Sequence, residues 1–168
     1  KLAIVSDTHM GNGREADNFH GNLKAFVKAL DYYDRNEYAL ILLGDIEELW
    51  QFDLHEIVEQ YGSDIYNRIK TFNDRGVQRV FGNHDLELHW PAVQAEFMAR
   101  LRLDASDRAR VRFCEWFYIS NGDTLIEHGS QYDAYCLFPT PIFPLIRKGS
   151  KRSVRLPFGN LAGRYMTN

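Results

Sequence analysis

Six side chains with metal-binding or acid–base chemistry stand at the ends of apolar runs in this sequence. They are Asp7 and His9, Asp45, Asn83 and His84, and His128. Carboxylate, amide and imidazole donors without a thiolate suit Mn, Fe, Zn or Ni better than a structural zinc site. A single Asp at a strand end more often caps a helix or turn, and a single His is more often an ordinary hydrogen-bonded residue. Four such clusters in one chain are hard to explain as turn chemistry, so the sequence predicts a metal site.

The densest cluster is Gly82-Asn83-His84-Asp85. Taken alone, it could form an ordinary turn, because Gly and Asn tolerate positive φ and Asp caps the segment after it. The three other clusters favour a functional site over a turn.

Three short apolar runs are predicted to position the first clusters. The predicted strands are Leu2–Val5, Ala39–Leu43 and Val77–Phe81. Apolar residues at helical spacing follow each of them, over residues 19–30, 54–69 and 91–101. Residues 111–129 are predicted to form a hairpin, with Asn121-Gly122 as a type I′ turn.

Strands that alternate with helices predict a layered α/β fold. The apolar runs are dense rather than alternating, which predicts strands that are covered on both faces. Ligands of open α/β sheets bind outside the carboxyl ends of the strands. The four clusters are therefore expected to meet at one rim of the sheet. No regular structure is predicted from residue 130 onward.

The composition is that of a globular chain. Its 168 residues, 45% of them hydrophobic, can bury a single core. Cys114 and Cys136 lack CxxC spacing, which predicts reduced thiols in a cytoplasmic protein. The chain opens directly on a predicted strand, without a signal-peptide pattern. No apolar run reaches the ~20 residues of a membrane helix, and the nearest, residues 137–146, is broken by three prolines.

The charge is unevenly distributed. No acidic residue follows Asp133, and residues 134–168 carry +6, so the preceding part carries −9 within a net charge of −3. A basic tail on an acidic body predicts an anionic partner for residues 137–164, such as a phosphate or the inner face of a membrane. The alternative is a merely solvated segment. The acidic body disfavours nucleic acid as a partner.

The motifs as a set resemble those of the calcineurin-like metallophosphoesterases. The matching stretches are DTH at 7–9, GD at 44–45, GNHD at 82–85 and HG at 128–129. The resemblance covers residues 1–129 and implies a layered αββα sandwich with two divalent metal ions. Manganese is the expected metal, with Fe, Zn and Ni as alternatives.

The resemblance also implies roles for individual residues. Asp45 would bridge the two metals, with Asp7 and His9 on one side and Asn83 and His128 on the other. His84 would either donate a proton to the leaving oxygen or help to hold the phosphate, and Asp85 would orient the His84 ring.

The chemistry of phosphoryl transfer accounts for these residue types independently. Two metals ~3.5–4 Å apart clamp the attacking and leaving oxygens of an in-line displacement, and a carboxylate between them offsets their repulsion. A neutral Asn ligand avoids excess negative charge at the metals. His84, beside Asn83 but free of metal binding, is placed to act as a general acid.

The chain departs from the family pattern at one motif. The closing G-H-x-H is absent, and no histidine follows His128. The missing initiating Met and the abrupt basic end suggest a fragment with an incomplete sandwich. We expect a metallophosphoesterase core over residues 1–129 and a Pro/Gly-rich basic segment, a candidate cap or lid, over residues 130–168.

A finer resemblance concerns the substrate. GDIEELW, with Glu48 and Trp50, resembles the G-D-x-x-E-x-W of the UDP-2,3-diacylglucosamine hydrolase branch, although that branch usually has Arg at the position of His84. Trp50 is thus a candidate substrate contact, and the alternative for Trp50 and Phe52 is core packing. Residues 137–152 are interpreted as a lid or docking segment rather than buried core, because apolar residues beside a basic cluster suit an interface.

The remaining candidates lie outside the motifs. Arg14 is expected either to meet a substrate phosphate or to be a surface residue. His20 and His55 are expected at the surface. For His89, packing is favoured over a place in the pocket.

The leading hypothesis is a dinuclear metal phosphoesterase that acts on a phosphorylated small molecule or lipid. A nuclease is the second enzymatic hypothesis. A non-catalytic scaffold with a vestigial metal site is the third: the missing histidines favour it, and the intact His84-Asp85 pair disfavours it. The sequence does not predict the oligomeric state.

Overall fold

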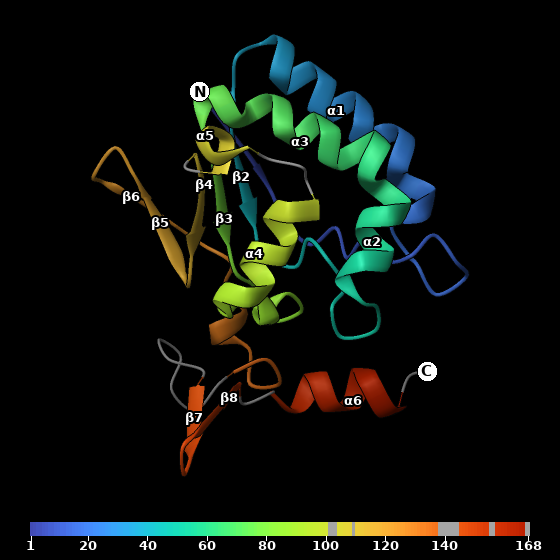
Figure 1. Cartoon of the computed structure of the whole chain (residues 1–168), viewed down its shortest axis with the longest axis vertical. Helices are drawn as coiled ribbons and strands as arrows, with labels where there is room; N and C mark the ends of the chain where they lie inside the picture. The colour runs from blue at the N-terminus through green and yellow to red at the C-terminus, as the bar shows by residue number, and fades with distance from the viewer. Residues whose placement is uncertain (101–103, 109, 138–144, 155–156, 167–168) are drawn as a thin grey trace.

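The computed structural model describes residues 1–100, 104–108, 110–137, 145–154 and 157–166 (Figure 1). Its strands are β1 (Leu2–Val5), β2 (Ala39–Leu43), β3 (Val77–Val80), β4 (Val111–Cys114), β5 (Phe117–Ser120), β6 (Thr124–Glu127), β7 (Leu145–Lys148) and β8 (Lys151–Val154). Its α-helices are α1 (Leu23–Arg35), α2 (Leu54–Tyr61), α3 (Asn67–Thr71), α4 (Pro91–Arg100), α5 (Ala105–Arg108) and α6 (Phe158–Met166). The prediction of a mixed α/β fold is confirmed.

A four-stranded parallel sheet forms the centre, with the strands in the order β1-β2-β3-β4. Val5 pairs with Leu42, and Leu43 pairs with Val80, so the carboxyl ends of the first three strands lie level. This register brings the loops that follow these strands together at one edge of the sheet.

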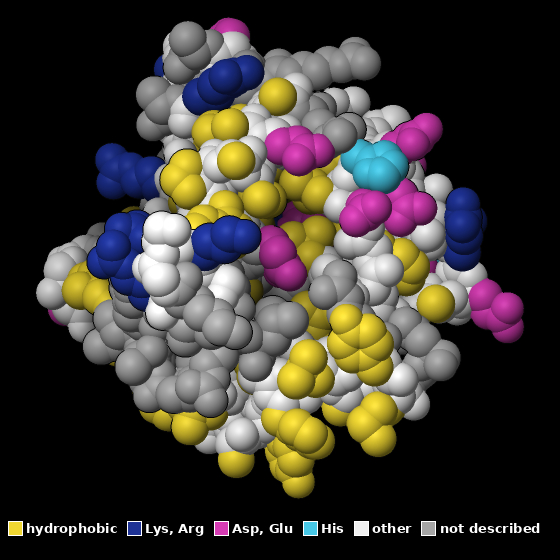
Figure 2. Space-filling view, turned by 60° about the horizontal axis from the view of Figure 1, so that its bottom comes forward, with side chains coloured by type: hydrophobic (Ala, Val, Ile, Leu, Met, Phe, Trp, Pro, Cys, Tyr) yellow, Lys and Arg dark blue, Asp and Glu magenta, His cyan; other side chains and the backbone are white. Residues whose placement is uncertain are grey.

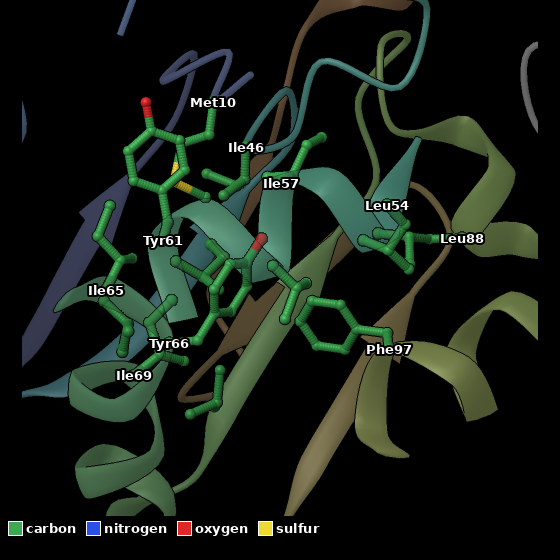
Figure 3. Close-up of a cluster of buried hydrophobic side chains, with 14 of the residues drawn as sticks. Met10, Ile46, Leu54, Ile57, Tyr61, Ile65, Tyr66, Ile69, Leu88 and Phe97 are labelled. Atoms are coloured by element: carbon green, nitrogen blue, oxygen red, sulfur yellow. The ribbon is translucent and has the colours of Figure 1, made fainter. Parts of the chain in front are cut away.

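The helices cover one face of this sheet (Figure 1). Side chains from β1–β3 pack there against α1, α2 and α3 in one buried cluster, part of which Figure 3 shows. A capping box between Asp53 and Glu56 starts α2, and a π-helical turn, η2 (Gly62–Tyr66), joins α2 to α3. The predicted helical run therefore continues from α2 to Thr71, and the chain turns at Gly76 with φ 86°.

The hairpin β5–β6 packs against the other face of the sheet. Ile126 of β6 contacts Ile41 and Val80 there. The predicted hairpin is corrected in two respects. Its first strand, β4, pairs with β3 in the parallel sheet. Ser120 pairs with Thr124, so the turn has one more residue than the predicted two.

The prediction that the strands are covered on both faces holds for β2 but is wrong for β1. Leu40, Ile41 and Leu42 are buried, whereas Leu2 and Ile4 are 37% and 49% exposed. The side chains of β1 alternate across the sheet, and among the described residues only one of its faces meets the helices.

Residues from 130 onward do have regular structure, contrary to the sequence prediction. A 3₁₀ turn, η5 (Ser130–Tyr132), is followed by the antiparallel pair β7–β8 and by α6. Residues 138–144 of the predicted lid lie outside the described residues. None of the helices that the structure describes is long and apolar enough to cross a membrane. The division into units 1–129 and 130–168 stays a prediction.

Candidate metal centre

The loops after β1, β2 and β6 bring their polar clusters together around Asp45. His128 Nε2 lies 3.5 Å from Asp45 Oδ2 and 3.5 Å from Asp7 Oδ1. His9 Nε2 lies 3.8 Å from the same oxygen of Asp45. Residues far apart in the chain thus converge at the rim, as expected from their positions after the strands.

The fourth cluster reaches the same place through the main chain. The backbone N–H of His84 donates to Asp45 Oδ1 at 2.8 Å. The Asn83 side chain is buried and directs Nδ2 to Cys136 Sγ at 3.6 Å. The loop that carries Asn83 is therefore attached directly to the Asp45 carboxylate.

Three of these residues have an unusual backbone. Asp7, His9 and Asp45 have φ values of 53°, 47° and 53°, in the left-handed region that non-glycine residues rarely adopt. Such strain persists only where the surroundings fix it, and it clusters at functional sites. Here His9 N donates to Asp45 O at 2.9 Å and Asp7 N to Gly44 O at 3.2 Å, so the strained residues support one another.

Two glycines permit this close approach. A Cβ on Gly44 would lie 2.6 Å from Cδ2 of the His128 ring, and a Cβ on Gly82 would collide with Asp45 Oδ1. The GD and GNHD motifs therefore place their glycines where a side chain would displace a candidate ligand.

The donor set fits a divalent cation. Both ring nitrogens of His128 lack a hydrogen-bond partner among the described residues, although the side chain is only 7% exposed. A buried polar group without a partner is costly. Ligands at about 2.1 Å from an ion lie about 3–3.5 Å from one another, which is close to the spacing of His128 from the two carboxylates. A further grouping of suitable donor atoms comprises His9, Glu48 and His84.

Glu48 links the predicted metal ligands to the predicted acid, a role that the sequence did not reveal. Its carboxylate lies 2.9 Å from His9 Nδ1, and its two oxygens lie 2.6 Å and 2.7 Å from His84 Nδ1. Burial alone would raise the pKa of Glu48, but the hydrogen bonds with His84 and His9 lower it to about 2. Burial disfavours the charged ring of His9, yet Glu48 and Asp45 together raise the pKa of His9.

The predicted role of Asp85 is corrected. The His84 ring is oriented by Glu48, whereas the fully buried Asp85 carboxylate accepts hydrogen bonds from Arg79 and from the backbone N–H groups of Gly82 and Ile46. Neighbouring residues in a turn point to different sides, so Asp85 does not have the role that the resemblance implied for it.

Trp50 is also placed differently from the predicted substrate contact. Its ring stacks on His84 at 3.5 Å with an interplanar angle of 11°, and its Nε1–H donates to Asn83 O at 2.7 Å. Only 6% of Trp50 is exposed. The packing alternative is therefore favoured, in a form that fixes the His84 ring and the Asn83 loop.

Burial and the nearby charge of Asp85 raise the pKa of Asp45 to about 7 in the metal-free chain. A bound cation would stabilise the charged form of this buried carboxylate and so lower its pKa.

Arg14, His20 and His55 are exposed. His89 Nδ1 lies 3.7 Å from Glu115 Oε1. The contact of Arg14 with a substrate stays a prediction.

Comparison with known proteins gives one result. The sequence model described as "Calcineurin-like phosphoesterase" (Metallophos) matches residues 1–154. In the same comparisons no curated protein and no solved structure matched.

Proposed function

This chain belongs to the calcineurin-like phosphoesterase family, and from that premise we propose that it hydrolyses a phosphodiester, pyrophosphate or phosphomonoester bond at a centre of two divalent metal ions. The observation that carries the proposal is the convergence of Asp7, Asp45 and His128 at the carboxyl ends of the strands, with no hydrogen-bond partner for the His128 ring nitrogens among the described residues.

The candidate ligands divide into two groups around Asp45. Asp7 and His9 would hold one ion and Asn83 and His128 the other, with the Asp45 carboxylate between them. Bound divalent ions supply charge that lowers the pKa of an attacking water and stabilises the transferred phosphoryl group. Manganese is the proposed metal, and Fe, Zn and Ni are the alternatives that a metal panel distinguishes.

His84 would act on the oxygen that leaves phosphorus. In the form of the His84 ring that carries a proton on both nitrogens, the Nδ1–H would donate to the Glu48 carboxylate, and the Nε2 proton would be the one available for transfer. Trp50 stacks on one face of the ring and restricts its rotation. His84 then donates the Nε2 proton to the leaving oxygen, or uses it to hold a phosphate oxygen.

Hydrolysis of an aryl phosphodiester tests this proposal. We expect turnover that requires Mn²⁺ and that falls by about 10²–10⁴-fold in H84N, as is typical when a general acid is removed. H55N is the matched control, because His55 is an exposed histidine on α2, and it should retain the wild-type rate. Absence of turnover with Mn²⁺, Fe²⁺, Zn²⁺ and Ni²⁺ alike would contradict the proposal.

A lipid-bearing substrate is the finer part of the proposal, and the surface next to the site supports it. Asn160 on α6 donates to Asn83 O at 3.5 Å, and the Phe158 ring lies 6.3 Å from that of the exposed Tyr135. An apolar surface therefore adjoins the loop of a candidate metal ligand. An acyl chain attached to the phosphate could pack against this apolar surface.

The same end of the molecule carries exposed basic side chains. In Figure 2, hydrophobic side chains gather on this face with Lys and Arg side chains beside them. Exposed basic residues on β7 and β8 are Arg147, Lys151 and Arg152. Apolar and basic side chains together suit the interface of an anionic membrane.

A pair of substrates tests the finer part. We expect a nucleoside diphosphate sugar that bears acyl chains to have a higher kcat/KM than the same sugar without them. An equal or lower value for the acylated compound would contradict a lipid-bearing substrate and leave the phosphoesterase proposal standing.

A further inference from the structure

Arg79 is a charged residue in the middle of β3, and its side chain is 0% exposed. It is neither a candidate ligand nor a candidate acid. A buried charge is costly unless it is paired and hydrogen-bonded. Its position in the core next to the metal centre therefore calls for a physical reason.

One side of the guanidinium meets Glu47. Arg79 Nη1 donates to Glu47 Oε1 at 3.1 Å, and Nη2 donates to the other oxygen. Tyr66 OH donates to Glu47 Oε1 at 2.6 Å, and the guanidinium lies 5.4 Å from the centroid of the Phe97 ring. The Glu47 contact fixes the backbone of the loop after β2 from the side of the core.

The guanidinium also meets Asp85, through the same Nη2 that donates to Glu47, and Asp85 joins two ligand loops. Its carboxylate accepts from the guanidinium at 2.9 Å, from Gly82 N at 2.7 Å and from Ile46 N at 3.0 Å. Ile46 follows Asp45 and Gly82 precedes Asn83. A single carboxylate thus ties together the loops that present two of the candidate ligands.

Backbone hydrogen bonds extend this attachment to the loop after β1. Met10 N donates to Ile46 O at 2.9 Å, and Glu48 N donates to Met10 O at 3.0 Å. The loop after β1 carries His9, and both His9 and Asp45 have a left-handed backbone conformation. Such backbone is retained only where neighbouring contacts fix it.

We propose that Arg79 is a positioning residue of the metal centre, which pairs with Glu47 and Asp85 in the core and so holds the loops after β1, β2 and β3 at ligand spacing. This inference rests on the proposed function for the presence of the metal. The inference adds that the spacing of the metal ligands depends on the buried guanidinium of Arg79, which contacts none of the ligands directly. A purely structural role would instead lower the stability of the fold without changing its affinity for metal.

The test compares R79K with Y66F. Lys presents one ammonium group and cannot reproduce the fork that reaches both carboxylates. Y66F removes one hydrogen bond to the Glu47 carboxylate and leaves both the Arg79–Glu47 and the Arg79–Asp85 contacts in place. Mn²⁺ affinity is measured by calorimetry and by the electron paramagnetic resonance of the bound ion, with the unfolding temperature measured in parallel.

For R79K we expect a 10- to 100-fold loss of Mn²⁺ affinity, the usual effect of changing an outer partner of a metal ligand. Y66F should lower the unfolding temperature and leave the affinity within about twofold. Equal losses of unfolding temperature in both variants, with unchanged Mn²⁺ affinity, would overturn the inference.

D85N keeps the test decisive if R79K fails to fold. Asn has one acceptor oxygen for the two backbone N–H groups, so the same loss of affinity is expected, and unchanged affinity in D85N would overturn the inference. Where both variants fold, R79K/D85N should lose little more than either single variant, because the residues act through one contact. The proposed function is tested separately. A wild-type chain that binds Mn²⁺ but hydrolyses no phosphoester would contradict the proposed function and would leave the inference about Arg79 unaffected.

Discussion

Two regions of the molecule differ in how their polar side chains are held: the rim at the carboxyl ends of β1–β3, and the surface over β7, β8 and α6. At the carboxyl ends of β1–β3 the polar side chains are cross-linked, Asp45, Asn83 and Asp85 are buried, and Asp45 alone meets two histidine rings and a backbone N–H. Over β7, β8 and α6, exposed side chains include the basic Arg147, Lys151 and Arg152 and the apolar Phe158, Leu161, Tyr165 and Met166.

This difference indicates that the two regions are suited to different functions. The rim holds strained backbone and like charges close together, which requires a rigid frame and is suited to binding small, highly charged ions. The α6 end presents exposed apolar side chains, which are suited to contact with a partner or substrate. Substitutions at the rim should therefore have large effects on metal binding and stability, and substitutions on α6 should affect only association.

The largest effect is expected for D45N. We expect activity to fall by more than the 10- to 100-fold that is typical of an outer partner of a metal ligand. The metal-free variant should nevertheless be more stable than the metal-free wild type at pH 8, by about 2 kcal/mol.

The sign follows from the raised pKa of Asp45. Its value of about 7 exceeds the ordinary 3.8, so the contribution of Asp45 to stability is fully present below pH 3.8 and is lost as the pH rises through 7. Asn carries no such charge. Chemical unfolding at pH 5 and pH 8 measures this, and a variant less stable than wild type at pH 8 would contradict the raised pKa.

The next largest effect is expected for G44A. Gly44 has φ 74°, and a Cβ there would meet the His128 ring at 2.6 Å and Gly82 Cα at 2.8 Å. We expect a loss of about 3 kcal/mol in the free energy of unfolding. The matched control is G122A in the β5–β6 turn, where φ is 80° and nothing lies within 4 Å. If the two variants lose equal stability, the close approach of His128 is not a constraint on the rim.

A smaller effect is expected for E48Q, which removes the charge between His9 and His84. We expect kcat to fall by about 10- to 100-fold. E59Q, at an exposed glutamate of α2, is the control and should keep the wild-type kcat.

The pH dependence of stability provides a second readout for Glu48. Because its pKa is lowered to about 2 from 4.5, the stability it contributes is present above pH 4.5 and is lost as the pH falls toward 2. The difference in unfolding temperature between metal-free wild type and E48Q should shrink over this window. A difference that does not change with pH would show that His9 and His84 do not hold the Glu48 charge.

The smallest effect is expected on α6. Leu161 and Tyr165 are 45% and 74% exposed. L161S/Y165S should weaken binding to vesicles that contain anionic lipid by about fivefold. Its unfolding temperature and its rate on a soluble aryl diester should remain those of wild type. Y32S, at an exposed tyrosine of α1, is the control, and equal vesicle binding by all three proteins would remove α6 from the proposed membrane surface.

The sequence predicted the parts of this molecule that depend on local pattern. Dense apolar runs gave the strands Leu2–Val5 and Ala39–Leu43, and the residues after them converge because parallel strands align their ends. Asn121 and Gly122 have the positive φ expected of their turn, even though the loop is longer than predicted. Residues 111–114 were assigned to the wrong partner strand, because a strand pattern does not specify its neighbour.

The rest depends on contacts between residues far apart in the chain. Glu48 meets His9 across 39 positions, and Arg79 meets Glu47 across 32, so no spacing rule could pair them. The one available signal for Arg79 was a charge inside an apolar run, which indicates a buried partner without naming it. Asp85 was assigned to its chain neighbour His84, although its carboxylate is directed into the core.

The measurement that tests the central claim most directly is the number of divalent ions bound per chain, determined by elemental analysis after equilibration with Mn²⁺. The account predicts about two ions for the wild type, fewer for D45N, and the wild-type number for H55N. A wild-type chain that binds no divalent ion, or a D45N chain that binds as many as wild type, would contradict a metal centre built on Asp45.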